Sequence, residues 1–298
     1  MSQPVARVSF LRHLGSTSSR RRIGGATGLA LALPALILFA AFSIYPIVQV
    51  FILSFFDYNL TSPPEPVGFA NFAYLSGDRR FLESFVQTVV YAVGTYLPAI
   101  ALGLLLAHAL RTPIRGMGLI RVLYFVPLAM SWVAVSIIWR VVLHPNGMIN
   151  EALGIDVNWL TSSETARWGL VLMSIWKETA FFLILFLAGL ASIPPGLHEA
   201  ARIDGASSWQ RFWHITWPLL RPITAVCTIT ATLRGFQSFT PQAVLTHGSF
   251  GTEVVNLFVY KTAFEHARMG RASAVAVLMF LLLLGLAAVQ LRALRRVD

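Results

Sequence analysis

The sequence predicts an all-α, polytopic membrane protein with six transmembrane helices and both termini in the cytoplasm. Of its 298 residues, 56% are apolar and only 12% are charged, whereas a soluble domain usually carries about 25% charged residues. The apolar residues form long runs of the length that a spanning helix needs, about 20 residues. The basic residues gather in alternate connections between these runs.

The first apolar run follows an arginine-rich N-terminal segment. Arg20, Arg21 and Arg22 resemble the start of a secretory signal, but no charged residue occurs from position 23 to position 56. The apolar core of a signal peptide has about 7–15 residues. We therefore expect an N-terminal tail of residues 1–27 and an uncleaved first spanning helix at about 28–51.

Five further apolar runs complete a predicted transmembrane domain of residues 28–292. A tail of residues 293–298 follows it. The runs lie between Glu83 and Arg111, between Arg121 and Arg140, at about 168–190, at about 222–239 and at 272–291.

The positive charges predict the orientation, because cytoplasmic connections are enriched in Arg and Lys. Fourteen of the 23 basic residues lie in the two tails and in the second-to-third and fourth-to-fifth connections, and six lie on the opposite side. We therefore expect both tails in the cytoplasm. The net charge of +10 comes from these connections, so we expect no nucleic-acid partner. The single cysteine, Cys227, excludes a disulfide within the chain.

The fourth-to-fifth connection, residues 191–221, predicts a helix, a turn and a second helix. Two prolines suit the start of the first helix. Gly205 fits the left-handed position that ends it, and Ser207 or Ser208 can cap the next. Such a hairpin either rests on the membrane or docks into a partner, and its compact apolar surface favours docking. That surface comprises Leu197, Ala201, Ile203, Trp209, Phe212 and Trp213.

The same connection resembles the EAA signature of binding-protein-dependent ABC permeases. Glu199, Ala200 and Ala201 are followed by Gly205 after three residues, by Ile215 after nine more, and then by Pro218. Residues 202–206 resemble the carbohydrate-uptake branch. Residues 292–298 lack the Gly-rich ending common in the partner permease subtype, so within that branch the chain resembles the maltose F-type or glycerol-phosphate A-type subunits. Four other segments also resemble the family: 69–72, 87–91, 121–127 and 176–190. The chain departs from the family pattern at Trp217 and at 247–249.

This resemblance implies a type I ABC importer permease fold, in which residues 191–221 couple the permease to an ATPase. Glu199 would make a polar contact with the ATPase, and Ala200 and Ala201 would keep the helix thin. Gly205 would set the exit turn, and Asp204 would pair with a basic ATPase residue or cap the turn. The implied partners are an ABC ATPase dimer, a second homologous permease, an extracytoplasmic solute-binding protein and membrane lipid.

The chain is not expected to be an enzyme, since it lacks the Gly-x4-Gly-Lys-Ser/Thr phosphate loop. ATP and Mg are expected on the partner ATPase, and no cofactor is expected here. Its scattered histidines do not suggest a membrane enzyme either. The expected location is the cytoplasmic (inner) membrane of a bacterium or archaeon.

Polar residues inside the spans are candidates for a substrate path, because intramembrane charges usually face a cavity or a partner. The alternative is a structural ion pair or an inter-subunit contact. Adjacent helical residues point about 100° apart, so Lys177 and Glu178 should not pair with each other. Trp132 and other tryptophans near span ends are interpreted as interfacial anchors. The candidate path residues are Lys177, Glu178, Arg234, Gln237 and Phe236, with Gln242 as a further possibility.

The function that these observations favour is an ATP-driven importer subunit for a sugar or sugar-like solute. Arg234 would also suit a glycerol phosphate or a related phosphorylated polyol. A secondary carrier driven by an ion gradient is a more distant alternative, because Glu178 is the one carboxylate clearly in the middle of a span.

Overall fold

The computed structural model describes residues 25–110 and 117–294. The expected tails, residues 1–27 and 293–298, lie almost entirely outside the described residues, as do Arg111 and Arg115. Contacts divide the chain into two units, residues 1–49 and 50–298.

The described part of the first unit is a continuous apolar helix. It comprises α1 (Gly25–Phe39), the π-helical turn η1 (Ala40–Ile44) and the start of α2 (Tyr45–Leu53). No charged side chain occurs along it. Nearly all of its side chains are exposed, and a helix that is apolar on every side is suited to contact with lipid.

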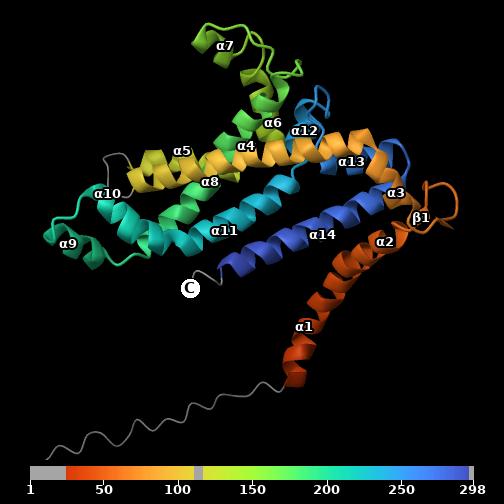
Figure 1. Ribbon diagram of the computed structural model, residues 1–298, viewed down its shortest axis with the longest axis horizontal. Helices are drawn as coiled ribbons and strands as arrows, with labels where there is room; N and C mark the ends of the chain where they lie inside the picture. Colours follow the sequence, from red (N-terminus) through yellow and green to blue (C-terminus); the bar gives the residue numbers. More distant parts are fainter. Residues whose placement is uncertain (1–24, 111–116, 295–298) are drawn as a thin grey trace, which may run out of the picture. The chain divides into compact units, whose positions relative to one another are not determined.

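The second unit is mostly helical, with one short antiparallel strand pair in which β1 (Phe56–Asp57) lies beside β2 (Glu65–Pro66). Figure 1 shows the helices in order. They are α3 (Ala70–Gly77), α4 (Arg79–Ala109), α5 (Met117–Ala129), α6 (Trp132–Val142), α7 (Met148–Leu153), α8 (Ala166–Ala191), α9 (Pro195–Ile203), α10 (Ser208–Arg211), η2 (Phe212–Thr216), α11 (Trp217–Phe236), α12 (Thr240–Leu245), α13 (Val255–Tyr260), η3 (Lys261–Glu265) and α14 (Met269–Leu294).

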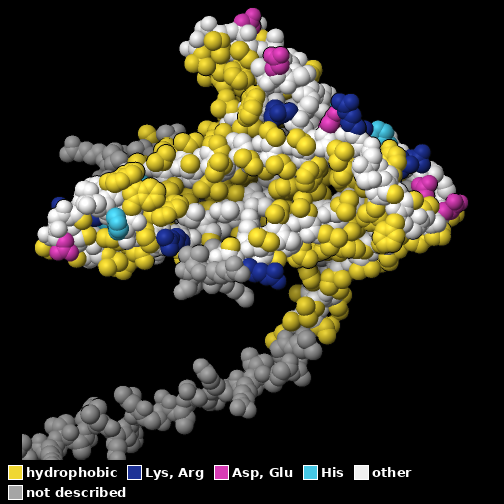
Figure 2. All heavy atoms as spheres, viewed as in Figure 1, with side chains coloured by type: hydrophobic (Ala, Val, Ile, Leu, Met, Phe, Trp, Pro, Cys, Tyr) yellow, Lys and Arg dark blue, Asp and Glu magenta, His cyan; other side chains and the backbone are white. Residues whose placement is uncertain are grey.

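Four helices within the described residues are long and apolar enough to cross a membrane. They are Ala30–Leu53, Arg79–Ala109, Ala166–Ala191 and Met269–Ala293, and they match the expected first, second, fourth and sixth spans. Figure 2 shows hydrophobic side chains over much of the visible face of the second unit. This exposed apolar surface is what a bilayer would cover.

The third and fifth expected spans differ from a simple apolar helix. The third is divided into α5 and α6, because the backbone of Ser131 is extended (ψ 152°) and ends the first helix. The fifth, α11, has 20 residues, but four are threonines and two are arginines, Arg221 and Arg234. The threonine hydroxyls at 224, 228 and 232 each donate to the carbonyl four residues earlier, so their polarity is largely satisfied within the helix.

The largest buried cluster of the second unit lies among α4, α8 and α11. Its largest fully buried side chains include Phe182, Phe186 and Leu220. Glycines let the helix backbones approach. A Cβ on Gly103 of α4 would lie 2.8 Å from the Cβ of Phe182 on α8, and one on Gly235 of α11 would lie 2.6 Å from the Cβ of Ala92 on α4. This close packing brings the polar residues of α8 and α11 together.

Candidate functional site

Two features hold most of the residues singled out from the sequence. The first is the loop hairpin, defined as α9, α10 and the turn between them. The second is the Arg234 cavity, a space of about 280 Å³ where α11 ends and α12 begins.

The turn of the loop hairpin forms as the sequence predicts. Pro195 lies in the first turn of α9, and Gly205 has a left-handed backbone with φ +78°. Ala206 N–H donates to Ala201 C=O at 2.9 Å, and Gly205 N–H donates to Arg202 C=O at 3.1 Å. This pair of bonds is the Schellman motif, which satisfies carbonyls that the helix end leaves free.

The second helix of the loop hairpin begins with a capping box. The Ser207 hydroxyl accepts a hydrogen bond from Gln210 N–H, and the Gln210 side chain accepts one from Ser207 N–H. From there the helix runs through η2 into α11. The hairpin is therefore joined to the helix that ends at the Arg234 cavity.

The hairpin surface is a shallow hollow with exposed apolar side chains beside it. Ala201, Asp204, Gly205 and Ile215 contribute to the lining of the hollow, which has a volume of about 330 Å³. Ile203 is 87% exposed, although it is apolar. Glu199 and Ala200 are also exposed but lie outside the lining, and Pro218 lies in the first turn of α11.

The Arg234 cavity combines aromatic rings with hydrogen-bonding groups. Glu178, Arg234 and Gln237, three of the candidate path residues, line it together. The full lining is Tyr96, Trp132, Glu178, Arg234, Gln237, Ser238, Phe239, Thr240 and Pro241. These residues come from α4, α6, α8, α11, α12 and the connection between the last two.

An ion pair forms one wall of this cavity. The Arg234 Nη1 atom donates to both oxygens of Glu178, at 3.0 and 3.2 Å. The Glu178 side chain is only 2% exposed, whereas that of Arg234 is 39% exposed. The Arg234 guanidinium also lies over the Phe181 ring, with its carbon 4.0 Å from the ring centre. The pair therefore joins α8 to α11 and leaves part of the guanidinium facing the cavity.

Lys177 does not pair with Glu178, as expected for adjacent residues of one helix. Its ammonium instead donates to the carbonyls of Pro127 and Met130. Phe236 also lies outside the cavity lining and packs against Phe85, with ring centres 6.4 Å apart. The cavity thus brings together three of the five candidate path residues.

A buried polar network supports the lining near Ser238. The Ser238 hydroxyl donates to Gln242 Oε1 at 3.0 Å, and Gln242 is fully buried. Tyr91 and Ser174 share a fully buried hydrogen bond of 2.7 Å between α4 and α8. Gln242, the further candidate, is therefore in contact with the lining without belonging to it.

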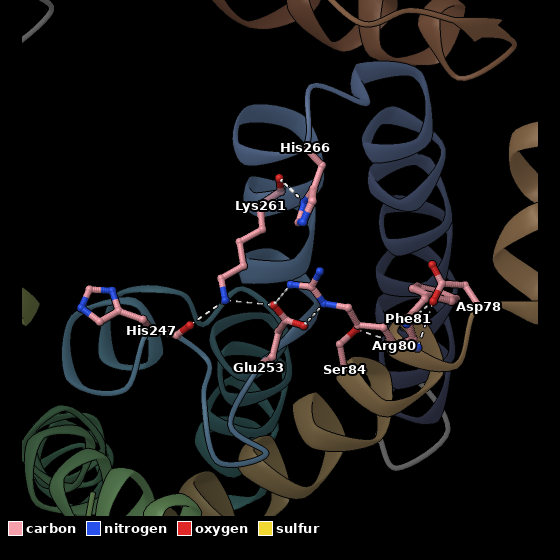
Figure 3. A network of polar contacts seen from close by, with 8 residues as sticks. All are labelled: Asp78, Arg80, Phe81, Ser84, His247, Glu253, Lys261 and His266. Atoms are coloured by element: carbon pink, nitrogen blue, oxygen red, sulfur yellow. Dashed lines mark hydrogen bonds and ion pairs between the residues drawn. The ribbon is translucent and has the colours of Figure 1, made fainter. Parts of the chain in front are cut away.

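Another polar network lies at the start of α4, between this helix and the segment that follows α12 (Figure 3). Arg80 donates to both Glu253 oxygens at 2.7 Å, and Lys261 Nζ lies 3.3 Å from Glu253. Lys261 also donates to His247 C=O at 2.6 Å. Burial raises the pKa of Glu253, but the hydrogen bonds and charges of Arg80 and Lys261 outweigh burial and leave that pKa below its usual value.

Sequence reasoning missed two aromatic residues of the cavity, Tyr96 and Trp132. The sequence pattern predicts an interfacial anchor at Trp132, but the structure places this residue in the cavity lining. Its position next to a helix start, one residue after the Ser131 cap, was the available signal. Tyr96 lies inside a long apolar helix, where nothing in the sequence distinguishes it from a packing residue.

Comparisons with known proteins agree with this architecture. Residues 99–297 match the family described as binding-protein-dependent transport system inner membrane component. The sulfoquinovosyl glycerol transport system permease protein SmoG of Agrobacterium fabrum is 33% identical, with 89% of each chain covered. The lactose transport system permease protein LacF of Rhizobium radiobacter is 31% identical, covering 84% of this chain and 87% of that protein.

A solved structure shows the same fold. It is that of a bacterial alginate ABC transporter in complex with an alginate pentasaccharide-bound periplasmic protein. The similarity covers 90% of this chain and 93% of that one, with a TM-score of 0.80 and 25% identity. The chain belongs to the family of binding-protein-dependent transport system inner membrane components and is a multi-pass permease of its carbohydrate-uptake branch.

Proposed function

We propose that this chain forms one half of the translocation path of an ATP-driven importer for an uncharged sugar or sugar-like solute. The observation that carries this proposal is the Arg234 cavity, in which aromatic rings and hydrogen-bonding side chains converge. Sugars present hydroxyl groups that need both donors and acceptors. Arg234, Gln237 and Ser238 supply such groups, while Trp132, Tyr96 and Phe239 supply apolar faces.

The charge of the cavity argues against a phosphorylated polyol as the solute. Arg234 is the one cationic residue of the lining, and Glu178 is the one anionic residue. Because they pair directly, the cavity offers no uncompensated positive charge to a phosphate group. The phosphorylated solute is therefore not favoured. Neither is a secondary carrier, since the matched family depends on a binding protein.

The family also suggests the topology and the partners. We infer six spans, with α5 and α6 together forming the third, and both termini in the cytoplasm. The loop hairpin would then face the cytoplasm and dock on an ABC ATPase dimer that holds ATP and Mg. A second homologous permease would complete the path, and an extracytoplasmic binding protein would deliver the solute. The periplasmic protein in the related alginate complex supports this last partner.

Within the loop hairpin, we assign the coupling contact to the exposed residues Glu199, Ala200 and Asp204 and to the half-buried Ala201. The exposed Ile203 and Trp209 would add apolar contact area. Gly205, Ile215 and Pro218 would fix the direction in which the hairpin continues into α11. Movement of the ATPase would thereby reach Arg234, at the other end of the same helix.

The test is co-purification of the chain from its native membrane, followed by an assay of solute-stimulated ATP hydrolysis. Glu199→Ala is expected to lose the ATPase or its stimulation by solute, while Glu164→Ala, an exposed glutamate outside the hairpin, is expected to behave as wild type. If the chain purifies alone and transports solute alone in vesicles, the coupling proposal is wrong.

A further inference from the structure

The break between α5 and α6 leaves backbone groups that need partners. The last four carbonyls of a helix lack N–H donors within it, and at membrane depth no water is present to satisfy a carbonyl that has no donor. At the start of α6 the Ser131 side chain accepts from Ala134 N–H at 3.2 Å. Val126 C=O accepts from Met130 N–H at 3.3 Å, whereas Pro127 C=O and the Met130 C=O that follows α5 need a donor from another element.

Lys177 of α8 is that donor. Its Nζ donates to Pro127 C=O at 2.6 Å and to Met130 C=O at 2.7 Å. Lys177 is buried, so these two bonds replace the water that a lysine ammonium otherwise binds. A positive charge is also favourable at this position, because the C-terminal end of a helix carries a partial negative charge.

The same ammonium lies against the first residue of α6. Lys177 Nζ is 5.1 Å from the centre of the Trp132 ring, which is within the range of a cation–π interaction. Trp132 lines the Arg234 cavity, whereas Lys177 does not. One side chain therefore contacts the end of α5, the start of α6 and an aromatic wall of the cavity.

We propose that Lys177 is a positioning residue that fixes the α5–α6 break and thereby holds the Trp132 ring in the cavity for contact with solute. This inference rests on the proposed function only in its last step, that the cavity admits solute. The preceding step, that Lys177 holds the break and Trp132, concerns this chain alone. The two steps are tested by separate measurements.

The first measurement is solute transport by the complete transporter in proteoliposomes. Lys177→Met keeps the length of the side chain and removes its donors, so KM is expected to rise roughly tenfold with little change in maximal rate. Trp132→Ala should raise KM by a similar factor, and the double variant should be no worse than Trp132→Ala alone. Lys177→Arg, which retains charge and donors, should stay within about twofold of wild type.

The second measurement needs no transport. Amide hydrogen exchange of the purified chain in lipid nanodiscs is expected to be roughly tenfold faster at residues 130–134 in Lys177→Met than in wild type. Trp176→Phe is the matched control, because Trp176 precedes Lys177 and contacts Trp139 of α6. Exchange at residues 130–134 and KM should both be unchanged in this control.

The outcomes separate the two steps. Unchanged exchange at residues 130–134 in Lys177→Met would overturn the positioning role, whatever the transport result. Faster exchange with an unchanged KM, or KM effects of Lys177→Met and Trp132→Ala that multiply in the double variant, would overturn the link to solute. If even the wild-type complex fails to transport, the proposed function fails, and the exchange result still decides the role of Lys177 in the break.

Discussion

Two arginine–glutamate pairs of the second unit have similar chemistry and different surroundings. Arg80 and Glu253 are 44% and 14% exposed, and the arginine meets the carboxylate through two nitrogens at 2.7 Å. Arg234 and Glu178 are 39% and 2% exposed, and the arginine meets the carboxylate through one nitrogen, at 3.0 and 3.2 Å. Lys261 lies beside Glu253, and Lys177 precedes Glu178 in the sequence.

The two pairs differ in which donors they leave free. Two nitrogens of the Arg80 guanidinium, Nε and Nη2, donate to Glu253. This pair therefore fastens the segment after α12 to the start of α4. The Arg234–Glu178 pair uses one nitrogen, so the guanidinium keeps donors directed at the cavity. We infer that the first pair is structural, and that the second combines a structural contact with solute recognition.

The largest expected effect follows the removal of one partner of the Arg234–Glu178 pair, the inner pair. Arg234→Ala leaves Glu178 buried without its cation, which costs about 3 kcal/mol of unfolding free energy. Chemical unfolding of the chain in a mixed micelle measures this loss. The neutral double variant Glu178→Gln with Arg234→Gln should recover most of the stability. A single variant as stable as wild type would contradict the buried-pair interpretation.

The same truncation in the Arg80–Glu253 pair, the outer pair, should cost less unfolding free energy. Arg80→Ala is expected to lower the unfolding free energy by about 1 kcal/mol, because water can solvate Glu253 and Lys261 remains beside it. The local effect should be clearer, with faster amide exchange at residues 246–254 than in wild type. A loss of stability larger than that of Arg234→Ala would reverse the order of the two pairs.

The smallest expected effect is the response of the outer pair to acid. The pKa of Glu253 is lower in the folded chain than its usual value. The stability that the Glu253 carboxylate contributes is therefore complete above the usual glutamate pKa, about 4.3. This contribution declines as the pH falls through the lower folded pKa. Protection of residues 246–254 from amide exchange should decrease over this acidic range. In Glu253→Gln the protection should already be lower at neutral pH and should not show this titration.

The sequence predicted the loop hairpin more completely than the cavity, for a physical reason. Helix starts, left-handed turns and capping boxes depend on residues within a few positions, so Gly205 and Ser207 could be interpreted directly. The spans at α4, α8 and α14 were also predictable, because runs of apolar residues are local. Their boundaries agree with the expected intervals to within a few residues.

The cavity depends on contacts between residues far apart in the chain. Glu178 meets Arg234 across 56 positions, and Lys177 meets Met130 across 47. The sequence indicated that Lys177 and Glu178 would point in different directions, but it could not identify the partner of either. The division of the third span also escaped prediction, because Pro127 and Ser131 lie in an interval apolar enough to be a single helix.

The role of the Arg234 cavity is tested most directly by comparing solute uptake by two neutralised transporters. In one, Glu178 and Arg234 are both changed to Gln, and in the other, Arg80 and Glu253 are both changed to Gln. The inner double variant is expected to assemble but to take up a labelled uncharged sugar with a KM raised roughly tenfold, which corresponds to about 1.4 kcal/mol of lost binding. The outer double variant should keep the wild-type KM. A wild-type KM in the inner variant would contradict the assignment of the Arg234 cavity to the solute path.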